Sequence, residues 1–130
     1  MMEEQKSTPT AAELEILTVL WEQQPLTVKE VHDKLSGTKE IGYTTALKMM
    51  QNMTAKGLLT REPNGKNHLY YPCYKKEETR GRLLDRFLDA TFAGSASSLV
   101  MQLLGNRKTN QDEIDEIKRI ISDMEQNQQP

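Results

Sequence analysis

The stretch from Gly42 to Gly57, GYTTALKMMQNMTAKG, constrains the fold of this chain more than any other. Apolar residues recur in it at i, i+3, i+4 and i+7, so one face of a short helix must be buried. These residues are Ala46, Met49, Met50 and Met53. Gly57 lies where a helix end needs a left-handed residue, and Leu58-Leu59 begins a pattern typical of a strand. We therefore predict a helix that is packed on one face and passes directly into a strand.

The outer face of this predicted helix is polar and has no carboxylate. Its residues are Thr44, Thr45, Lys48, Gln51 and Asn52. Hydroxyl, amide and ammonium groups can bond to base edges and phosphates in a DNA major groove. Amphipathic helices with a polar outer face are common in soluble proteins, so this face alone is weak evidence for DNA binding. The flanking segments strengthen it.

Two further helices are predicted before this one. Thr10 with Glu13, and Thr27 with Glu30, each form a T-x-x-E capping box, in which hydroxyl and carboxylate satisfy free amides at a helix start. Pro25 stops the first helix. The apolar stripes of the two helices comprise Leu14, Ile16, Leu17, Leu20 and Trp21, then Val28, Val31 and Leu35. Three helices in this order predict a core of the helix-turn-helix type.

A β-hairpin is predicted after Gly57, in the sequence LLTREPNGKNHLYYPCY. Two β-prone runs flank residues 63–66, and Asn-Gly is the strongest two-residue turn signal. Arg61 and Lys66 place two cations on or near the hairpin tip. We expect Tyr70 and its neighbours to pack the hairpin on the helices rather than stack on bases. A helix-turn-helix core followed by such a hairpin, or wing, is a winged helix.

The net charge of −2 conceals a segregation along the chain. Residues 1–38 carry three lysines and seven acidic residues, a balance of −4, whereas residues 39–75 carry six basic and two acidic residues, a balance of +4. Binding to phosphates depends on the local patch of charge. The acidic total therefore does not exclude DNA as a partner.

The sequence predicts neither an enzyme nor a cofactor or metal site. It has no Gly-rich phosphate loop, His-Glu-x-x-His run or nucleophile elbow. One thiol, Cys73, and two distant histidines, His32 and His68, exclude an intrachain disulfide and argue against structural zinc. No run of 18 apolar residues and no signal peptide is present, so we expect a cytoplasmic protein without membrane insertion.

Three amphipathic helical segments are predicted from Lys76 onward, where the β-prone runs cease. They carry more Leu, Ile and Phe than they can bury among themselves, so we predict association with a second copy. The predicted dimerisation residues are Leu84, Phe87, Leu88, Phe92, Leu99, Leu103, Ile114, Ile117 and Ile121. The alternative is a monomer in which these helices pack back on the winged helix.

The predicted fold is mainly α with a small β-hairpin wing. Residues 1–75 would form a winged helix-turn-helix DNA-binding domain, and residues 76–130 a C-terminal helical dimerisation domain. The predicted function is DNA binding by a homodimer. A second class of function fits the same fold, namely an adaptor that binds protein through the same faces without sequence-specific DNA binding.

Four stretches of the chain resemble the penicillinase repressors of the BlaI/MecI/CopY type. They are TAAELEILTVLWEQQPLTVKEV (10–31), GYTTALKMMQNMTAKGLLTREPNGKNHLYYP (42–72), FAGSASSLVMQLL (92–104) and NQDEIDEIKRII (110–121). The resemblance implies a homodimeric transcriptional repressor whose winged helix binds a pseudo-palindromic DNA operator. It carries DNA contact to six residues, and the polar helix face adds a seventh, Gln51. The full set is Tyr43, Thr44, Thr45, Lys48, Gln51, Arg61 and Lys66.

The resemblance also suggests how such a repressor is regulated. Members of the β-lactam branch are inactivated by proteolysis in the segment that matches SLVMQLL, usually between Asn and Phe, where this chain has Gln102-Leu103. This implies Gln102-Leu103 as a candidate proteolytic site, a membrane sensor-protease as a partner, and control of β-lactam resistance or a related stress operon. The copper-responsive branch ends in a cysteine-rich motif that is missing here, so a copper response is not expected.

Overall fold

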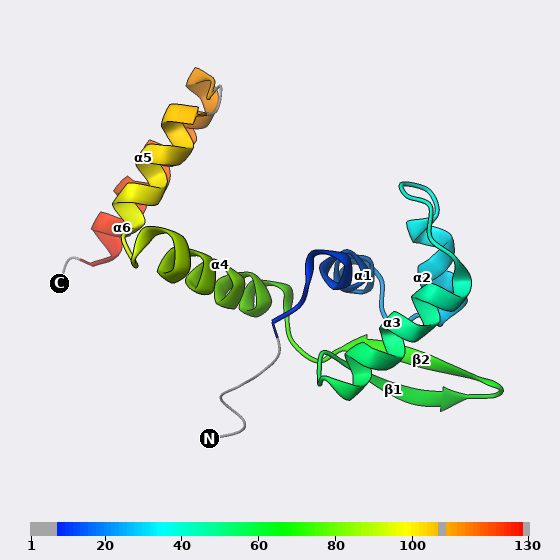
Figure 1. Cartoon of the computed structure of the whole chain (residues 1–130). Coiled ribbons are helices and arrows are strands. Elements are labelled where there is room, and N and C mark those ends of the chain that lie inside the picture. Colours follow the sequence, from blue (N-terminus) through cyan, green and yellow to red (C-terminus); the bar gives the residue numbers. More distant parts are fainter. Residues whose placement is uncertain (1–7, 107–108, 129–130) are drawn as a thin grey trace. The chain divides into compact units, whose positions relative to one another are not determined.

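The computed structural model describes residues 8–106 and 109–128 (Figure 1). The chain forms two compact units, residues 1–84 and residues 85–130, and each is described by itself. The elements in order are α1 (Ala11–Glu22), α2 (Val28–Leu35), α3 (Tyr43–Ala55), β1 (Leu59–Asn64), β2 (Asn67–Pro72), α4 (Lys76–Phe92), α5 (Ala96–Asn106) and α6 (Gln111–Asn127). The chain is thus mainly helical with one small antiparallel hairpin, as the sequence predicts.

The first unit packs three helices and the hairpin around one core. Strand β1 pairs with β2 from Leu59↔Pro72 to Asn64↔Asn67. Leu26, between α1 and α2, forms a β-bridge with Tyr70, through backbone N–H···O distances of 2.8 and 3.3 Å. The buried core comprises Ile16, Leu17, Leu20, Leu26, Val28, Val31, Leu35, Ala46, Met50, Met53, Leu58, Leu59 and Tyr70. The hairpin is therefore anchored to the helices through Tyr70, which confirms the packing role predicted for this residue.

The first two helices begin with the predicted capping boxes, and a side chain also caps α6. Thr10 caps α1 and Thr27 caps α2, and in each box the glutamate three residues later returns a bond to the cap amide. Asn110 caps α6 by accepting a hydrogen bond from the amide of Glu113 at 2.8 Å. These caps satisfy amides that have no partner within the helix.

The end of α3 sets the path of the chain into the wing. Gly57 has a φ of +84°, which is the left-handed region that glycine adopts without strain. Its amide donates to the carbonyl of Thr54 at 3.2 Å, and the amide of Leu58 donates to the carbonyl of Met53 at 2.9 Å. This pair of bonds is the Schellman motif, and the predicted passage from helix to strand through Gly57 is confirmed.

The turn of the wing lies one residue later than the Asn-Gly signal predicts. Asn64 pairs with Asn67, so the two loop residues are Gly65 and Lys66. Gly65 has a φ of +66°, and glycine at the first loop position is the arrangement of a type II′ turn. Lys66 is therefore at the tip of the wing.

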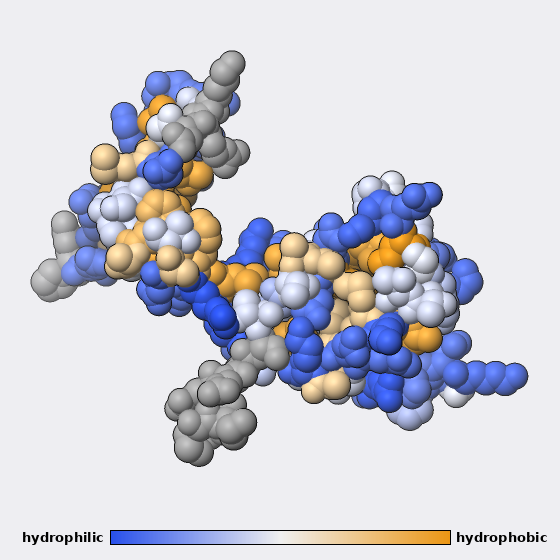
Figure 2. Space-filling model, viewed as in Figure 1, coloured by the Kyte–Doolittle hydropathy of each residue, from blue (hydrophilic) through white to orange (hydrophobic). Residues whose placement is uncertain are grey.

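The second unit continues α4 and contains α5 and α6. Helix α4 ends at Phe92, and Ala93 and Gly94 after it take φ values of 52° and 80°. No apolar side chain is buried among the described residues of this unit, 85–106 and 109–128. Figure 2 shows apolar side chains at the surface of this unit. The exposed large apolar residues are Phe87, Val100, Met101, Leu103, Leu104, Ile120, Ile121 and Met124.

No single helix in the described ranges meets the length and hydropathy of a membrane span. The bent pair formed by α4 and residues 96–105, with an angle of 86° between them, meets those criteria only when taken together.

Candidate DNA-binding surface

The outer face of α3 presents the polar side chains that the sequence analysis singles out. Ala46, Met50 and Met53 are fully buried on the inner face. The five predicted contact residues of this helix are all exposed on the other side, namely Tyr43, Thr44, Thr45, Lys48 and Gln51. With no acidic side chain anywhere in α3, this face can approach a polyanion without charge repulsion from its own residues.

A groove of about 310 Å³ lies between α2, α3 and the hairpin. It brings together four of the seven predicted DNA-contacting residues, which are Tyr43, Gln51, Arg61 and Lys66. The other three, Thr44, Thr45 and Lys48, are on the exposed part of α3 and do not line it. Helix and wing thus form one concave surface.

Three further polar residues line the same groove and were not singled out from the sequence. Lys29 comes from α2, and Asn67 and His68 come from β2. No local signal distinguishes Lys29 from any other surface lysine, because only the tertiary fold brings α2 beside the wing. Asn67 and His68 follow the turn directly, so their proximity to Lys66 is the one cue in the sequence.

The cations of this surface differ in how freely they can meet a phosphate. Among the described residues, Lys48 and Lys66 have neither an ion pair nor a hydrogen bond. Arg61 Nη1 donates a hydrogen bond to the hydroxyl of the buried Tyr70, at 3.4 Å, and this bond restrains the orientation of the Arg61 side chain. Lys29 is paired with Asp33 at 3.2 Å. Lys48, Arg61 and Lys66 are therefore the cations best placed for DNA.

Two lysines of the basic segment are instead engaged inside the protein. Lys39 pairs with Glu15 at 2.7 Å, and Lys56 donates to both carboxylate oxygens of Glu13 at 2.9 and 2.8 Å. Glu13 is only 8% exposed and also accepts from the backbone of Thr10. The charge of +4 counted along the sequence consequently overstates the charge that this surface can offer to a ligand.

The Glu13–Lys56 pair joins α1 to the end of α3. Burial raises the pKa of Glu13, but the hydrogen bonds and charge of Lys56 and the bonds with Thr10 outweigh it, so the pKa lies below its ordinary value. Glu13 is thus ionised in the folded protein at neutral pH and holds the last turn of α3 against α1.

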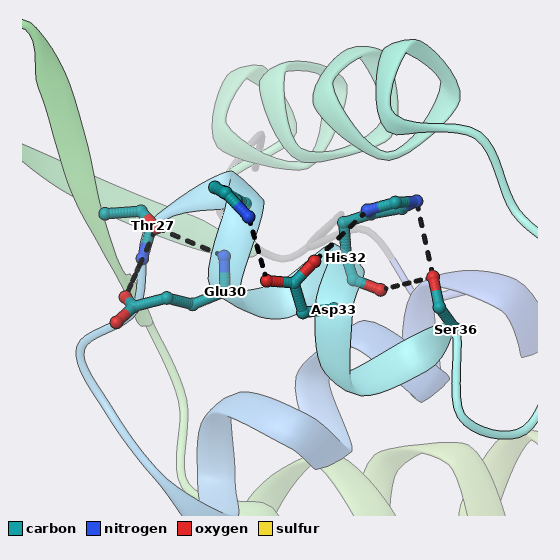
Figure 3. A network of polar contacts seen from close by, with 6 residues as sticks. Thr27, Glu30, His32, Asp33 and Ser36 are labelled. Carbon is teal, nitrogen blue, oxygen red and sulfur yellow. Dashed lines mark hydrogen bonds and ion pairs between the residues drawn. The ribbon is translucent and has the colours of Figure 1, made fainter.

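A polar network runs along α2 (Figure 3), and its His32 also contacts the backbone just before α3. His32 Nε2 lies 2.7 Å from the carbonyl oxygen of Ile41, and since a carbonyl only accepts, Nε2 must carry the proton. Asp33 Oδ1 is 3.7 Å from Nδ1, and the Ser36 hydroxyl donates to the carbonyl of His32 at 2.8 Å. The His32 ring also meets the ring of Tyr43 edge-on, with centroids 6.0 Å apart. These contacts fix the first turn of α3.

The predicted dimerisation and cleavage residues are all accessible in the single chain. Leu84, Phe87, Leu103 and Ile121 are exposed, and the other five are half-buried: Leu88, Phe92, Leu99, Ile114 and Ile117. Gln102 and Leu103 are exposed within α5. In the described part of the chain, no three His, Cys, Asp or Glu side chains are grouped to hold a metal ion.

Comparisons with known proteins match nearly the whole chain. The sequence model of the family described as penicillinase repressor matches residues 9–123. The transcriptional regulator BlaI of Mycobacterium tuberculosis is 26% identical over 112 residues, which are 85% of this chain and 80% of that protein. The penicillinase repressor of Bacillus licheniformis is 27% identical over 112 residues, or 86% and 88% of the two chains. The methicillin resistance regulatory protein MecI of Staphylococcus aureus is 20% identical over 113 residues, or 87% and 92%.

Solved structures agree with the observed fold. A solution structure of the DNA-binding domain of the repressor BlaI matches with a TM-score of 0.50 and 28% identity, over 56% of this chain and 92% of that one. The B. licheniformis BlaI monomer in complex with the blaP half-operator matches with a TM-score of 0.50 and 26% identity, over 57% and 90%. A Thermotoga maritima transcriptional regulator, 19% identical, shares the fold over 91% of this chain with a TM-score of 0.52.

The family is one of repressors and not of enzymes. The family match and the fold, together with the polar surface of α3 and the wing, show that this chain belongs to the penicillinase repressor family of winged-helix, DNA-binding transcriptional regulators.

Proposed function

We propose that this protein is a homodimeric repressor that binds a pseudo-palindromic operator, with one α3 helix in the major groove of each half-site and one wing against the neighbouring phosphates. The observation that carries the proposal is the groove that joins Tyr43 and Gln51 of α3 to Arg61 and Lys66 of the wing. Thr44, Thr45 and Gln51 would contact the base edges, and the cations would contact the phosphates.

The relatives support this assignment. The BlaI of B. licheniformis was solved as a monomer on a half-operator, and the match covers 57% of this chain. If one protomer reads one half-site here too, two protomers are needed for a symmetric operator. Such a repressor works in the cytoplasm, where the bacterial chromosome is.

The second protomer is expected to cover the apolar side chains of the C-terminal helices. A single chain leaves Phe87 49% exposed and Ile121 51% exposed. A set of exposed apolar residues of this extent is typical of an interaction surface. Pairing of residues 76–130 with the same residues of a second copy would bury them, as in an isologous dimer.

Selection from a pool of random duplexes tests the proposal, because it lets the protein itself identify the operator. The full chain should enrich an inverted repeat whose half-sites lie about one helical turn, or a small multiple of it, apart. Footprinting on the enriched sequence should protect both halves. Enrichment of a single half-site would refute the dimeric assignment, and no enrichment at all would favour the protein-binding adaptor.

We further propose that repression ends when α5 is cut at or next to Gln102-Leu103 by a membrane sensor-protease, in response to a β-lactam or a related stress. The cut would separate α6 from α4 and remove part of the apolar surface that pairs the protomers. Two linked DNA-binding domains gain about 10²- to 10⁴-fold in affinity for two half-sites through effective concentration, and two unlinked domains lose this gain. Because the bond lies within a helix, α5 must open locally before a protease can bind it.

Mass spectrometry of the protein from cells exposed to a cell-wall antibiotic tests this release mechanism. Two fragments that meet at or beside Gln102-Leu103 are the expected result. An intact chain in fully induced cells would show that the repressor is released by another route.

A further inference from the structure

The junction between the wing and α4 is joined to α1 by a partly buried hydrogen bond. The indole N–H of Trp21 donates to the carbonyl oxygen of Tyr74, at 2.9 Å, across 53 residues of sequence. Thr79, in the first turns of α4, is only 2% exposed. The first compact unit accordingly extends to residue 84, so the start of α4 belongs with the winged helix.

Among the described residues, Arg82 is held at this junction by an aromatic ring and not by an acidic side chain. Its guanidinium carbon lies 4.5 Å from the centroid of the Tyr74 ring. Both terminal nitrogens are buried, and neither has a hydrogen-bond partner among the described residues. Unmade hydrogen bonds of a charged group are costly, so an arginine placed this way depends on its cation–π contact. The Tyr74 ring is thus what keeps Arg82 in position.

We propose that Arg82 is a positioning residue for operator binding. By stacking on Tyr74, it holds the first turns of α4 against the winged helix, so that a dimer paired through its C-terminal helices presents two recognition helices at the spacing of one operator. This inference rests on the homodimeric operator binding proposed above. It adds that binding to both half-sites at once depends on a side chain that is outside the proposed DNA-contacting and dimerisation residues.

Arg82 can affect operator binding because two linked DNA-binding domains gain affinity from being held together. The second half-site is bound at an effective concentration that is highest when the linkage matches the span, and that falls when the linkage is loose. A junction held in one conformation also avoids the entropy of ordering it on DNA. Loosening the junction should therefore weaken binding to two half-sites and leave binding to one half-site unchanged.

The experiment compares a duplex carrying the full selected inverted repeat with a duplex carrying a single half-site. Arg82→Ala should lose about 10- to 100-fold on the full site and change little on the half-site. Arg80→Ala is the matched control, because it removes the same charge from an exposed position of the same helix. Tyr74→Leu should reproduce the loss of affinity. Tyr74→Phe, which keeps the ring, should retain the wild-type affinity for the full site.

Sedimentation and thermal melting of each variant separate positioning from folding. The inference predicts that Arg82→Ala stays folded and dimeric while the ratio of full-site to half-site affinity falls. Equal losses on both duplexes, or a ratio that matches Arg80→Ala, would overturn it. If Arg82→Ala does not fold, Tyr74→Leu and Arg82→Lys give the same ratio test. Wild-type protein that binds the full site no better than the half-site would instead refute the proposed function, and this inference with it.

Discussion

Lys66 offers a direct test of the DNA-binding surface, because it lies at the tip of the wing with no partner among the described residues. Replacing it with alanine removes one cation and breaks no ion pair or hydrogen bond of the described residues. The expected effect is a smaller dependence of DNA affinity on salt. Any duplex can serve as the probe, since phosphate contacts do not depend on sequence.

The size of the effect follows from the number of accessible cations. Each phosphate neutralised on duplex DNA contributes about −0.9 to the slope of log affinity against log salt. Lys48, Arg61 and Lys66 in each protomer give about six contacts per dimer and a slope of about −5.4. Affinity should then fall about 10³-fold between roughly 50 and 200 mM salt. Lys66→Ala removes two contacts per dimer, which gives a slope of about −3.6 and a fall of about 10²-fold.

Fluorescence anisotropy with a labelled random-sequence duplex, titrated at several salt concentrations, measures both slopes. Lys34→Ala is the matched control, because Lys34 is an exposed lysine of α2 that lines a different depression with Glu15 and Glu22. Its slope should equal that of the wild type. Equal slopes for Lys66→Ala and Lys34→Ala, or a wild-type affinity that ignores salt, would refute the assignment of the wing to DNA.

Three other outcomes are expected. Thr44→Ala should reduce the binding free energy for the selected operator by about 1–3 kcal/mol and that for random DNA by little, as measured in competition assays. Equal losses on both DNAs would show that Thr44 does not contribute to sequence recognition. Ile117→Asp places an unpaired charge in the proposed dimer interface at a cost of several kcal/mol, so sedimentation should show monomers or unfolded chains, and a stable dimer would contradict the interface. The pKa of Glu13 is lowered, so its stabilisation is present above its ordinary pKa of 4.5 and is lost as the pH falls through the folded value. Lys56→Ala should therefore lower the free energy of unfolding by roughly 1–2 kcal/mol at neutral pH, a value discounted for the exposure of Lys56. In urea titrations at several pH values, the variant should also lose less stability than the wild type as the pH falls. An unchanged loss of stability at acid pH would show that the Glu13–Lys56 pair does not cause it.

The sequence predicts best those features whose hydrogen bonds close within a few residues. Thr10 with Glu13 forms a box over three residues, and Gly57 ends α3 through bonds to the preceding turn. Such signals depend little on the rest of the fold, so they can be recognised before it is known. Even here the hairpin turn is shifted by one residue, because Gly65 can be the second residue of an Asn64-Gly65 loop or the first residue of a Gly65-Lys66 loop.

Contacts between distant segments are what sequence spacing does not predict. Lys56 looks like a free cation in the basic segment, yet it is bonded to Glu13, 43 residues away. Lys29 looks like an ordinary surface charge of a short helix, yet it lines the groove beside the wing. Both roles come from the packing of α1, α2 and α3, and no periodicity within one helix records which residue of another it will meet.

The absence of a buried apolar side chain among the described residues of 85–130 has a consequence for the life of the protein in the cell. If the proposed dimer forms, a newly synthesised protomer lacks the partner that would cover these helices, so their stability would depend on the concentration of other copies. Below the dissociation constant for pairing, these helices would open and be degraded. A steady number of repressor molecules would then be maintained by turnover of the unpaired ones as well as by the rate of synthesis.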